Sequence, residues 1–261
     1  MKKICLLAAF LILLTSCVIV VENPSDVEVA LPINEFHKII YLDPGGTISL
    51  ENINGNIEIH GWDKEEVEIF AEKIIPRGYE RRVYWLWKNY SQPKVHLDKF
   101  ENFIKIKTQF TGKNQEENIV DYYLKVPRPI ELKDISNTNG DIFISDLYGE
   151  AIINLINGKV EVENFSGSLS ASTANGSIKA SLYDLREEDQ IRLTTKQGNI
   201  TIYLQPEVNA QIEAKTSNGT ISSEFDLNQT LPAEKISSKI GQGGVLISLS
   251  TLNGNIKIKK L

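Results

Sequence analysis

Residues 140–184 decide the fold, and they read as five nine-residue blocks: GDIFISDLY, GEAIINLIN, GKVEVENFS, GSLSASTAN and GSIKASLYD. Every block begins with glycine, and its third, fifth and eighth residues are apolar. The spacing of two between the third and fifth residues is that of a β-strand with one buried face. Because this strand unit returns at a fixed period, the stretch predicts a stacked array rather than a conventional globular core.

Asparagine before glycine marks the turns of this array, because both residue types tolerate the positive φ of a tight turn. Asn-Gly is also a strong hairpin signal, so a β-meander is the rival interpretation. The nine-residue register continues through Gly149 and Gly167, which no asparagine precedes, and this favours a solenoid. The Asn-Gly pairs, with one Gln-Gly, begin at Asn54, Asn139, Asn157, Asn175, Gln197, Asn218 and Asn253.

Two nine-residue blocks together make one coil of 18 residues, which places Asn139, Asn157 and Asn175 one above another. We therefore predict an all-β fold, a β-solenoid similar to a single-stranded β-helix, with nine-residue half-coils and 18 or more residues per coil. The stacked asparagines are expected to form an amide ladder between coils about 4.8 Å apart. A ligand-binding surface is the alternative role for this row.

The repeat starts early, stops and then resumes. Gly46 and Gly55 are nine residues apart, but the period breaks between about residues 60 and 135. We expect this insertion to hold antiparallel strands with a protruding hairpin, inside a solenoid domain that spans 36–261. After Gly176 the glycine spacing lengthens, which predicts surface loops at the corners of the coils. The strands expected in the insertion are 67–71, 103–107 and 122–126. The expected loops are 186–190, 206–208 and 228–234.

The first residues resemble the signal peptide of a bacterial lipoprotein. Two lysines precede an apolar run over 4–14 that is too short to span a membrane, and LTSC at 14–17 is similar to a lipobox. We expect 1–16 to be removed, Cys17 to carry lipid, and 17–35 to form a tether. An ordinary secretory signal is the alternative.

A lipid on Cys17 would make the membrane a partner and the cell envelope the location. Residue 18 is valine rather than aspartate, which by resemblance permits outer-membrane placement or the periplasmic face in a Gram-negative source. Cys5 lies in the segment expected to be removed, so the mature chain would have one cysteine and no disulfide.

The charge balance argues against one class of partner. The chain has 28 Lys and Arg against 34 Asp and Glu, a net charge of −6. A general nucleic-acid binder needs a basic face, so we expect no nucleic-acid partner.

The sequence shows no pattern typical of a catalytic, metal or cofactor site, so we expect none of these. The three histidines lack the spacing of metal ligands, and no nucleophile elbow or phosphate loop is present. The second block position has no aspartate column, unlike a calcium-binding nonapeptide roll. The enzyme alternative is a β-solenoid polysaccharide-degrading enzyme with paired acids. Its candidate acids are Asp141, Glu161 and Glu163.

Four threonines stand three residues before a glycine, and we expect them to stack as β-branched strand residues. An exposed threonine ladder that faces a ligand is the alternative. The four are Thr173, Thr195, Thr216 and Thr251.

Residues 77–94 combine five aromatic side chains with five basic ones and a single acid. One interpretation is a hairpin whose aromatic face packs on the flank of the solenoid. The other is an exposed patch that contacts a glycan, lipid headgroups or an envelope protein. The candidate contact residues are Arg81, Arg82, Tyr84, Trp85 and Trp87.

The Asn-Gly-x-Ile repeats, together with LKVPR at 124–128, Gly243-Gly244 and NGNI at 253–256, resemble the bacterial β-strand-repeat family labelled "putative adhesin". The resemblance covers roughly 39–261. It implies a β-solenoid domain of unknown function on an envelope protein or lipoprotein, with no catalytic motif to carry over.

We therefore expect a non-catalytic envelope lipoprotein with a structural or adhesive role. Two alternatives stay open, a polysaccharide-binding module and a solenoid enzyme.

Overall fold

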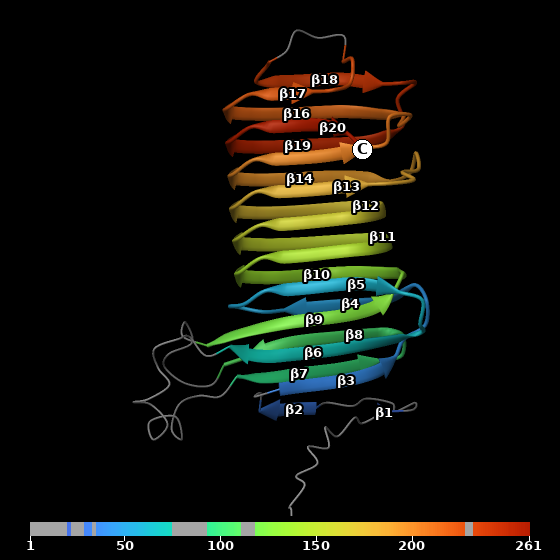
Figure 1. Cartoon of the computed structure of the whole chain (residues 1–261), viewed down its shortest axis with the longest axis vertical. Coiled ribbons are helices and arrows are strands. Elements are labelled where there is room, and N and C mark those ends of the chain that lie inside the picture. Colours follow the sequence, from blue (N-terminus) through green and yellow to red (C-terminus); the bar gives the residue numbers. More distant parts are fainter. Residues whose placement is uncertain (1–19, 22–28, 33–34, 75–92, 111–117, 228–231) are drawn as a thin grey trace, which may run out of the picture.

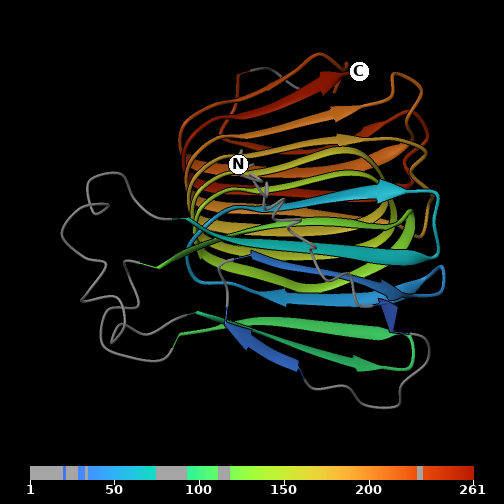
Figure 2. The same cartoon turned by 60° about the horizontal axis from the view of Figure 1, so that its bottom comes forward.

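The computed structural model describes residues 20–21, 29–32, 35–74, 93–110, 118–227 and 232–261. Within these ranges the chain contains twenty strands and no helix, and the strands stack along one long axis (Figure 1). The coils follow one behind another as flattened rings when the stack is seen more nearly from its base (Figure 2). The predicted all-β solenoid is confirmed.

Two parallel walls form the body of the stack. The first wall contains, from base to top, β9 (Ile119–Pro127), β5 (Ile57–Trp62), the first parts of β11 (Ile142–Asn157) and β12 (Val160–Asn175), β13 (Ile178–Leu182), β15 (Ile200–Leu204), β20 (Ile256–Lys260) and β17 (Ile221–Ser223). The second wall contains β8 (Phe103–Gln109), β4 (Gly46–Glu51), β10 (Pro129–Asn139), the later parts of β11 and β12, β14 (Gln190–Gln197), β19 (Val245–Asn253) and β16 (Ala210–Asn218).

Both ends of the stack contain antiparallel strand pairs, and the short β1 pairs in parallel with β3 at the base. At the top, β18 (Lys235–Ile240) pairs with β16. At the base, the first wall continues through β6 (Glu66–Ile74), β3 (Glu35–Tyr41) and β1 (Val20–Val21), and the second through β7 (Lys94–Phe100) and β2 (Val29–Pro32). The three strands expected in the insertion are present as β6, β8 and β9, and β7 is an additional strand. The expected antiparallel pairing occurs between β6 and β9 and between β7 and β8. Strands β8 and β9 also pair in parallel with β4 and β5.

The register between β11 and β12 fixes the length of the coil. Ile142 lies beside Val160 and Asn157 beside Asn175, a shift of 18 residues in a parallel ladder. The meander alternative is therefore wrong for the body of the stack, because a meander would pair these strands antiparallel. Apolar side chains from both walls fill the space between them, and the core is continuous along the stack.

The nine-residue blocks are not equivalent, because the two corners of a coil differ. Asp146 has a φ of 60° in the left-handed region, and this local bulge turns Leu147, the eighth residue of its block, into the core. In the next block the seventh residue, Leu155, is buried, and the eighth, Ile156, is 50% exposed. The structural repeat is thus the 18-residue coil.

The amide ladder is also confirmed. The Nδ2 group of Asn157 donates to Asn139 Oδ1 at 2.8 Å, and the Nδ2 group of Asn175 donates to Asn157 Oδ1 at 2.8 Å. Asn139 in turn donates to Asn54, so the amides join four successive coils along one corner.

The threonine column faces inward, which contradicts the alternative of an exposed threonine ladder. All four side chains are buried, and each hydroxyl donates to a glycine carbonyl of the adjacent coil at the corner. For Thr195 the acceptor is the carbonyl oxygen of Gly176, at 2.9 Å. The threonines therefore satisfy backbone acceptors inside the stack.

Candidate functional site

The residues predicted to contact lipid or ligand lie outside the described part of the chain. They are Cys17, Arg81, Arg82, Tyr84, Trp85 and Trp87. The strands on either side of the aromatic stretch are β6, which ends at Ile74, and β7, which begins at Lys94. Both strands lie in the basal part of the stack, where β6 pairs with β9 and β7 pairs with β8.

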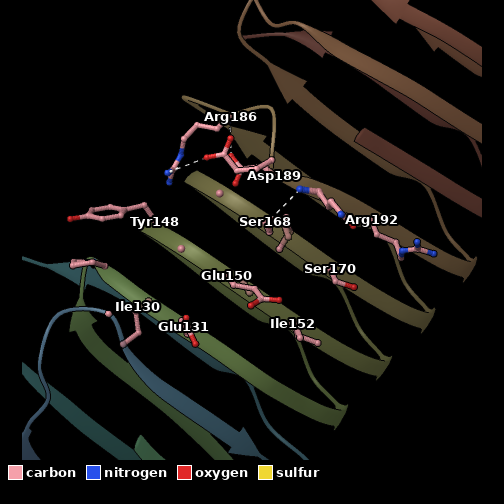
Figure 3. Close-up of a pocket in the computed structure, with 18 residues that line it drawn as sticks. Ile130, Glu131, Tyr148, Glu150, Ile152, Ser168, Ser170, Arg186, Asp189 and Arg192 are labelled. Carbon is pink, nitrogen blue, oxygen red and sulfur yellow. Dashed lines mark hydrogen bonds and ion pairs between the residues drawn. The ribbon is translucent and has the colours of Figure 1, made fainter. Parts of the chain in front are cut away.

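A groove of about 700 Å³ crosses the outer face of the second wall, over β10, β11, β12 and β14 (Figure 3). One side is formed by the turn between β13 and β14, which supplies Arg186, Glu188 and Asp189. This turn is part of the loop predicted from the lengthened glycine spacing. Tyr148 stands at one end with 47% of its surface exposed.

Register places the polar side chains of the groove in two rows. Glu131, Glu150 and Ser168 occupy the first row on successive strands. Ser170 and Arg192 follow Ile152 in the second row, as the diagonal of labelled side chains in Figure 3 shows. These rows exist because alternate strand residues point outward, while their neighbours fill the core.

Several of the groove charges already have protein partners. The ammonium of Lys133 lies 2.8 Å from Glu131, and this hydrogen bond raises the pKa of Lys133 above its usual value. Arg186 lies 3.6 Å from Glu188. The buried carboxylate of Asp189 accepts the backbone N–H of Arg186 at 2.7 Å and so holds the turn. Within the described ranges, Glu150 and Arg192 form no salt bridge.

A second cluster, on the first wall, surrounds His60. Its ring lies between Tyr123 and Phe143, at centroid distances of 5.0 and 5.4 Å. His60 Nδ1 is 2.9 Å from the Ser145 hydroxyl, which donates to Asp146 Oδ2 at 3.0 Å. Since that hydroxyl has one proton, Nδ1–H is the donor toward Ser145.

This order differs from that of a hydrolytic triad. In a triad the histidine lies between the nucleophile and the carboxylate and accepts the proton of the nucleophile. Here Ser145 lies between His60 and Asp146, and its proton points to the carboxylate. A hydrogen bond from Asn164 is the main cause that lowers the pKa of Asp146, so this carboxylate stays ionised. The geometry fits a structural link between coils.

The three candidate acids of the polysaccharide-degrading alternative lie at two separate positions, one at a corner and two on the first wall. Asp141 lies at a corner, where its Oδ1 accepts the backbone N–H of Lys159 at 2.8 Å. Glu161 and Glu163 both bind the ammonium of Lys179 on the first wall, at 2.6 and 3.0 Å. The hydrogen bond from Lys179 lowers the pKa of Glu161, which disfavours it as a proton donor.

Sequence reasoning missed the groove and the His60 cluster because each joins residues that are far apart in the chain. The loop at 186–190 was the one local signal for the groove. In the described ranges no group of three or more His, Cys, Asp or Glu side chains is arranged to hold a metal ion, and no helix there is long and apolar enough to cross a membrane.

Solved structures of similar proteins give a distant comparison. The chain is similar to crystal structures of a "putative cell adhesion protein" from Clostridium sporogenes (13% identity, 87% of this chain and 100% of that chain, TM-score 0.44) and a "putative adhesin" from Bacteroides fragilis (12%, 86% and 96%, 0.38). A "putative adhesin" from Parabacteroides merdae is also similar (13%, 94% and 99%, 0.26). No curated protein sequence matches.

A sequence model of the family described as Toastrack DUF4097 matches residues 12–259. This agrees with the β-strand-repeat family that the Asn-Gly motifs resemble. Because the match spans most of the sequence, the chain belongs to the Toastrack DUF4097 family.

Proposed function

We propose that this protein is a non-catalytic, lipid-anchored protein of the cell envelope whose solenoid has a structural or adhesive role. The observation that carries the proposal is the position of β1 at the base of the stack, where it pairs with β3 (Figure 1). Val20 follows Cys17 by three residues, a reach of at most about 10 Å. A lipid on Cys17 would therefore hold the base near the membrane and leave the rest of the stack to extend from it.

The architecture suits a platform for contacts. A solenoid coil is supported by its neighbours, so its outer walls are held by a continuous core rather than by loops. The groove on the second wall lies several strands above the base, at β10 to β14, where a partner could reach it.

The anchor is tested by fractionating cells that express the full chain, the variant Cys17→Ser or the variant Cys5→Ser. We expect the wild type and Cys5→Ser in the detergent-dependent membrane fraction, and Cys17→Ser in the soluble fraction. Retention of Cys17→Ser in the membrane would contradict the anchor.

The adhesive role is tested by comparing attachment of cells with and without the protein to isolated envelope material. We expect attachment to fall when the protein is absent, and no reducing sugar ends to be released when it is present. If Trp85 and Trp87 take part, the double change to alanine lowers attachment. Equal attachment with and without the protein would contradict an adhesive role.

A polysaccharide-binding module is the second candidate, and the exposed Tyr148 beside the polar groove favours it. The solenoid enzyme is disfavoured by the contacts of Glu161 and Glu163 with Lys179. If the protein releases reducing sugar ends from envelope polysaccharide and the variant Glu161→Gln does not, the solenoid enzyme becomes the better candidate.

A further inference from the structure

We propose that the groove over β10, β11, β12 and β14 binds a neutral oligosaccharide. The inference rests on the proposed adhesive function and names its ligand class. Apart from the loop at 186–190, the sequence pattern does not point to this site, because its two rows and its side loop meet only in the folded stack (Figure 3).

The shape of the groove suits a short linear chain. It runs across successive strands of a regular wall, and neighbouring strands repeat at about 4.8 Å. The turn that carries Arg186 and Asp189 borders it on one side, and Asp189 fixes this turn through the 2.7 Å bond to the Arg186 N–H. A preformed border lowers the ordering cost of binding.

The chemistry of the groove suits sugar hydroxyl groups. Glu150 on β11 offers a carboxylate acceptor and Arg192 on β14 offers a planar set of donors. Ser170, on the intervening strand β12 and beside Arg192, has a hydroxyl that can donate and accept. Glu150 and Arg192 have no salt-bridge partner within the described ranges, and both are exposed. Acceptor, hydroxyl and donor thus lie on three adjacent strands, and together they can bind neighbouring hydroxyl groups of a sugar.

Tyr148 adds the apolar part of the site. Its ring is 47% exposed at the end of the groove, beside the first row of side chains. An exposed tyrosine ring offers a flat apolar face for the C–H face of a sugar ring, with a polar hydroxyl at its edge.

The charges favour a neutral ligand over an acidic one. The groove contains four carboxylates, Glu131, Glu150, Glu188 and Asp189, against Arg186 and Arg192. Lys133 offsets Glu131, which leaves a small negative excess. An acidic polysaccharide would therefore be repelled, as would a nucleic acid.

A peptide fits the groove less well than a glycan. Strands β11, β12 and β14 are hydrogen-bonded to a neighbour on both sides, so no free strand edge remains for β-augmentation. Twelve of the eighteen lining residues are polar or glycine, so a peptide finds few side chains that could form an apolar anchor pocket.

The test is calorimetric titration of the full chain with cellohexaose, maltohexaose, chitohexaose and, as the acidic probe, hexagalacturonate. We expect a neutral hexasaccharide to bind and hexagalacturonate not to bind. The changes Tyr148→Ala, Glu150→Gln and Arg192→Gln should each weaken binding about tenfold, the scale of one ring contact or one charged hydrogen bond. The matched controls are Tyr41→Ala, at the base and equally exposed, and Glu213→Gln, on β16 beyond the groove.

Three results would overturn the inference. They are the absence of binding by every neutral hexasaccharide, binding of hexagalacturonate alone, and neutral binding that the three groove variants leave unchanged. All variants change exposed side chains, and unchanged thermal melting confirms that they fold. If any one of these results occurs while cells still need the protein for attachment, the groove inference fails and the proposed function stands. If attachment does not need the protein, the proposed function itself fails.

Discussion

Gly158 shows why glycine returns at this corner of every coil. Its φ is +141°, and a Cβ atom built there would lie 2.1 Å from the carbonyl oxygen of Gly140 in the adjacent coil. Glycine is therefore required at this position for two reasons, the backbone conformation and the close approach of the next coil. At Gly45 only the backbone conformation favours glycine, because its φ is +77° but nothing lies within 4 Å of an added Cβ atom.

We expect Gly158→Ala to lower the free energy of unfolding by at least about 3 kcal/mol, from backbone strain plus displacement of the neighbouring coil. The control Gly45→Ala should cost about 1 kcal/mol, from conformation alone. Chemical denaturation of both variants measures the difference. Equal effects would contradict the role of the close approach, and Gly158→Val should be at least as severe as Gly158→Ala.

The buried threonines give a second prediction at the residue scale. Thr195→Val keeps the shape of the side chain but leaves the carbonyl oxygen of Gly176 without its hydroxyl donor. We expect a loss of about 1–2 kcal/mol, the cost of an unpaired buried acceptor. The adjacent Thr194 is exposed, so Thr194→Val should change stability by less than about 0.5 kcal/mol. Similar urea midpoints for the two variants would contradict the internal bond.

At the scale of elements, Lys179 on β13 ties together two carboxylates of β12. Its hydrogen bond lowers the pKa of Glu161 below the usual value of about 4.3. A carboxyl whose pKa is lower in the folded than in the unfolded chain stabilises the fold above its unfolded pKa. This contribution is lost as the pH falls through the folded pKa.

Lys179→Met should therefore reduce the loss of stability on the acid side. Above about pH 5 we expect the variant to be less stable by about 0.5 kcal/mol, a small value because the pair is partly exposed. As the pH falls through the lowered pKa of folded Glu161, the urea midpoints of variant and wild type should converge. Lys196→Met, which removes an exposed lysine of β14, serves as the control. A difference that stays constant from pH 7 to pH 3 would contradict the assigned ion pairs.

At the scale of the molecule, the order of coils along the stack differs from their order in the chain. The last coil, β19 and β20, is inserted between the coil of β14 and β15 and the coil of β16 and β17. The antiparallel strand β18 covers the outer edge of β16. The C-terminal residues are therefore an internal layer of the solenoid, although the C-terminus lies at its surface (Figure 1).

Removal of residues 245–261 should expose the edges of four strands inside the stack, those of β14, β15, β16 and β17, rather than shorten one end. We expect backbone amides of β16 to β18 to lose protection from hydrogen exchange, while those of β11 and β12 keep it. In a control that removes only Lys260 and Leu261, the amides of β16 to β18 and those of β11 and β12 should all keep their protection from hydrogen exchange. If β16 closes directly onto β14 and stays protected, the inserted coil is not needed to hold the top of the stack.

The repeat in residues 140–184 was enough to predict the solenoid, the 18-residue coil and the stacking of Asn139, Asn157 and Asn175. These features depend on local turn chemistry and on alternation along a strand, which neighbouring residues determine. The difference between Leu147 and Ile156 was not predictable, because both are apolar at the eighth position and only the left-handed conformation of Asp146 separates them.

The sequence by itself determined the element type, the coil length and the turns, because each depends on residues within one or two half-coils. Only the tertiary structure decided which coils are neighbours, since any edge of a regular parallel coil can accept another coil of the same register. It therefore decided the insertion of β19 and β20. It also decided the meeting of Glu150, Ser170 and Arg192 in one groove, because these residues lie on separate coils that contact one another only after stacking.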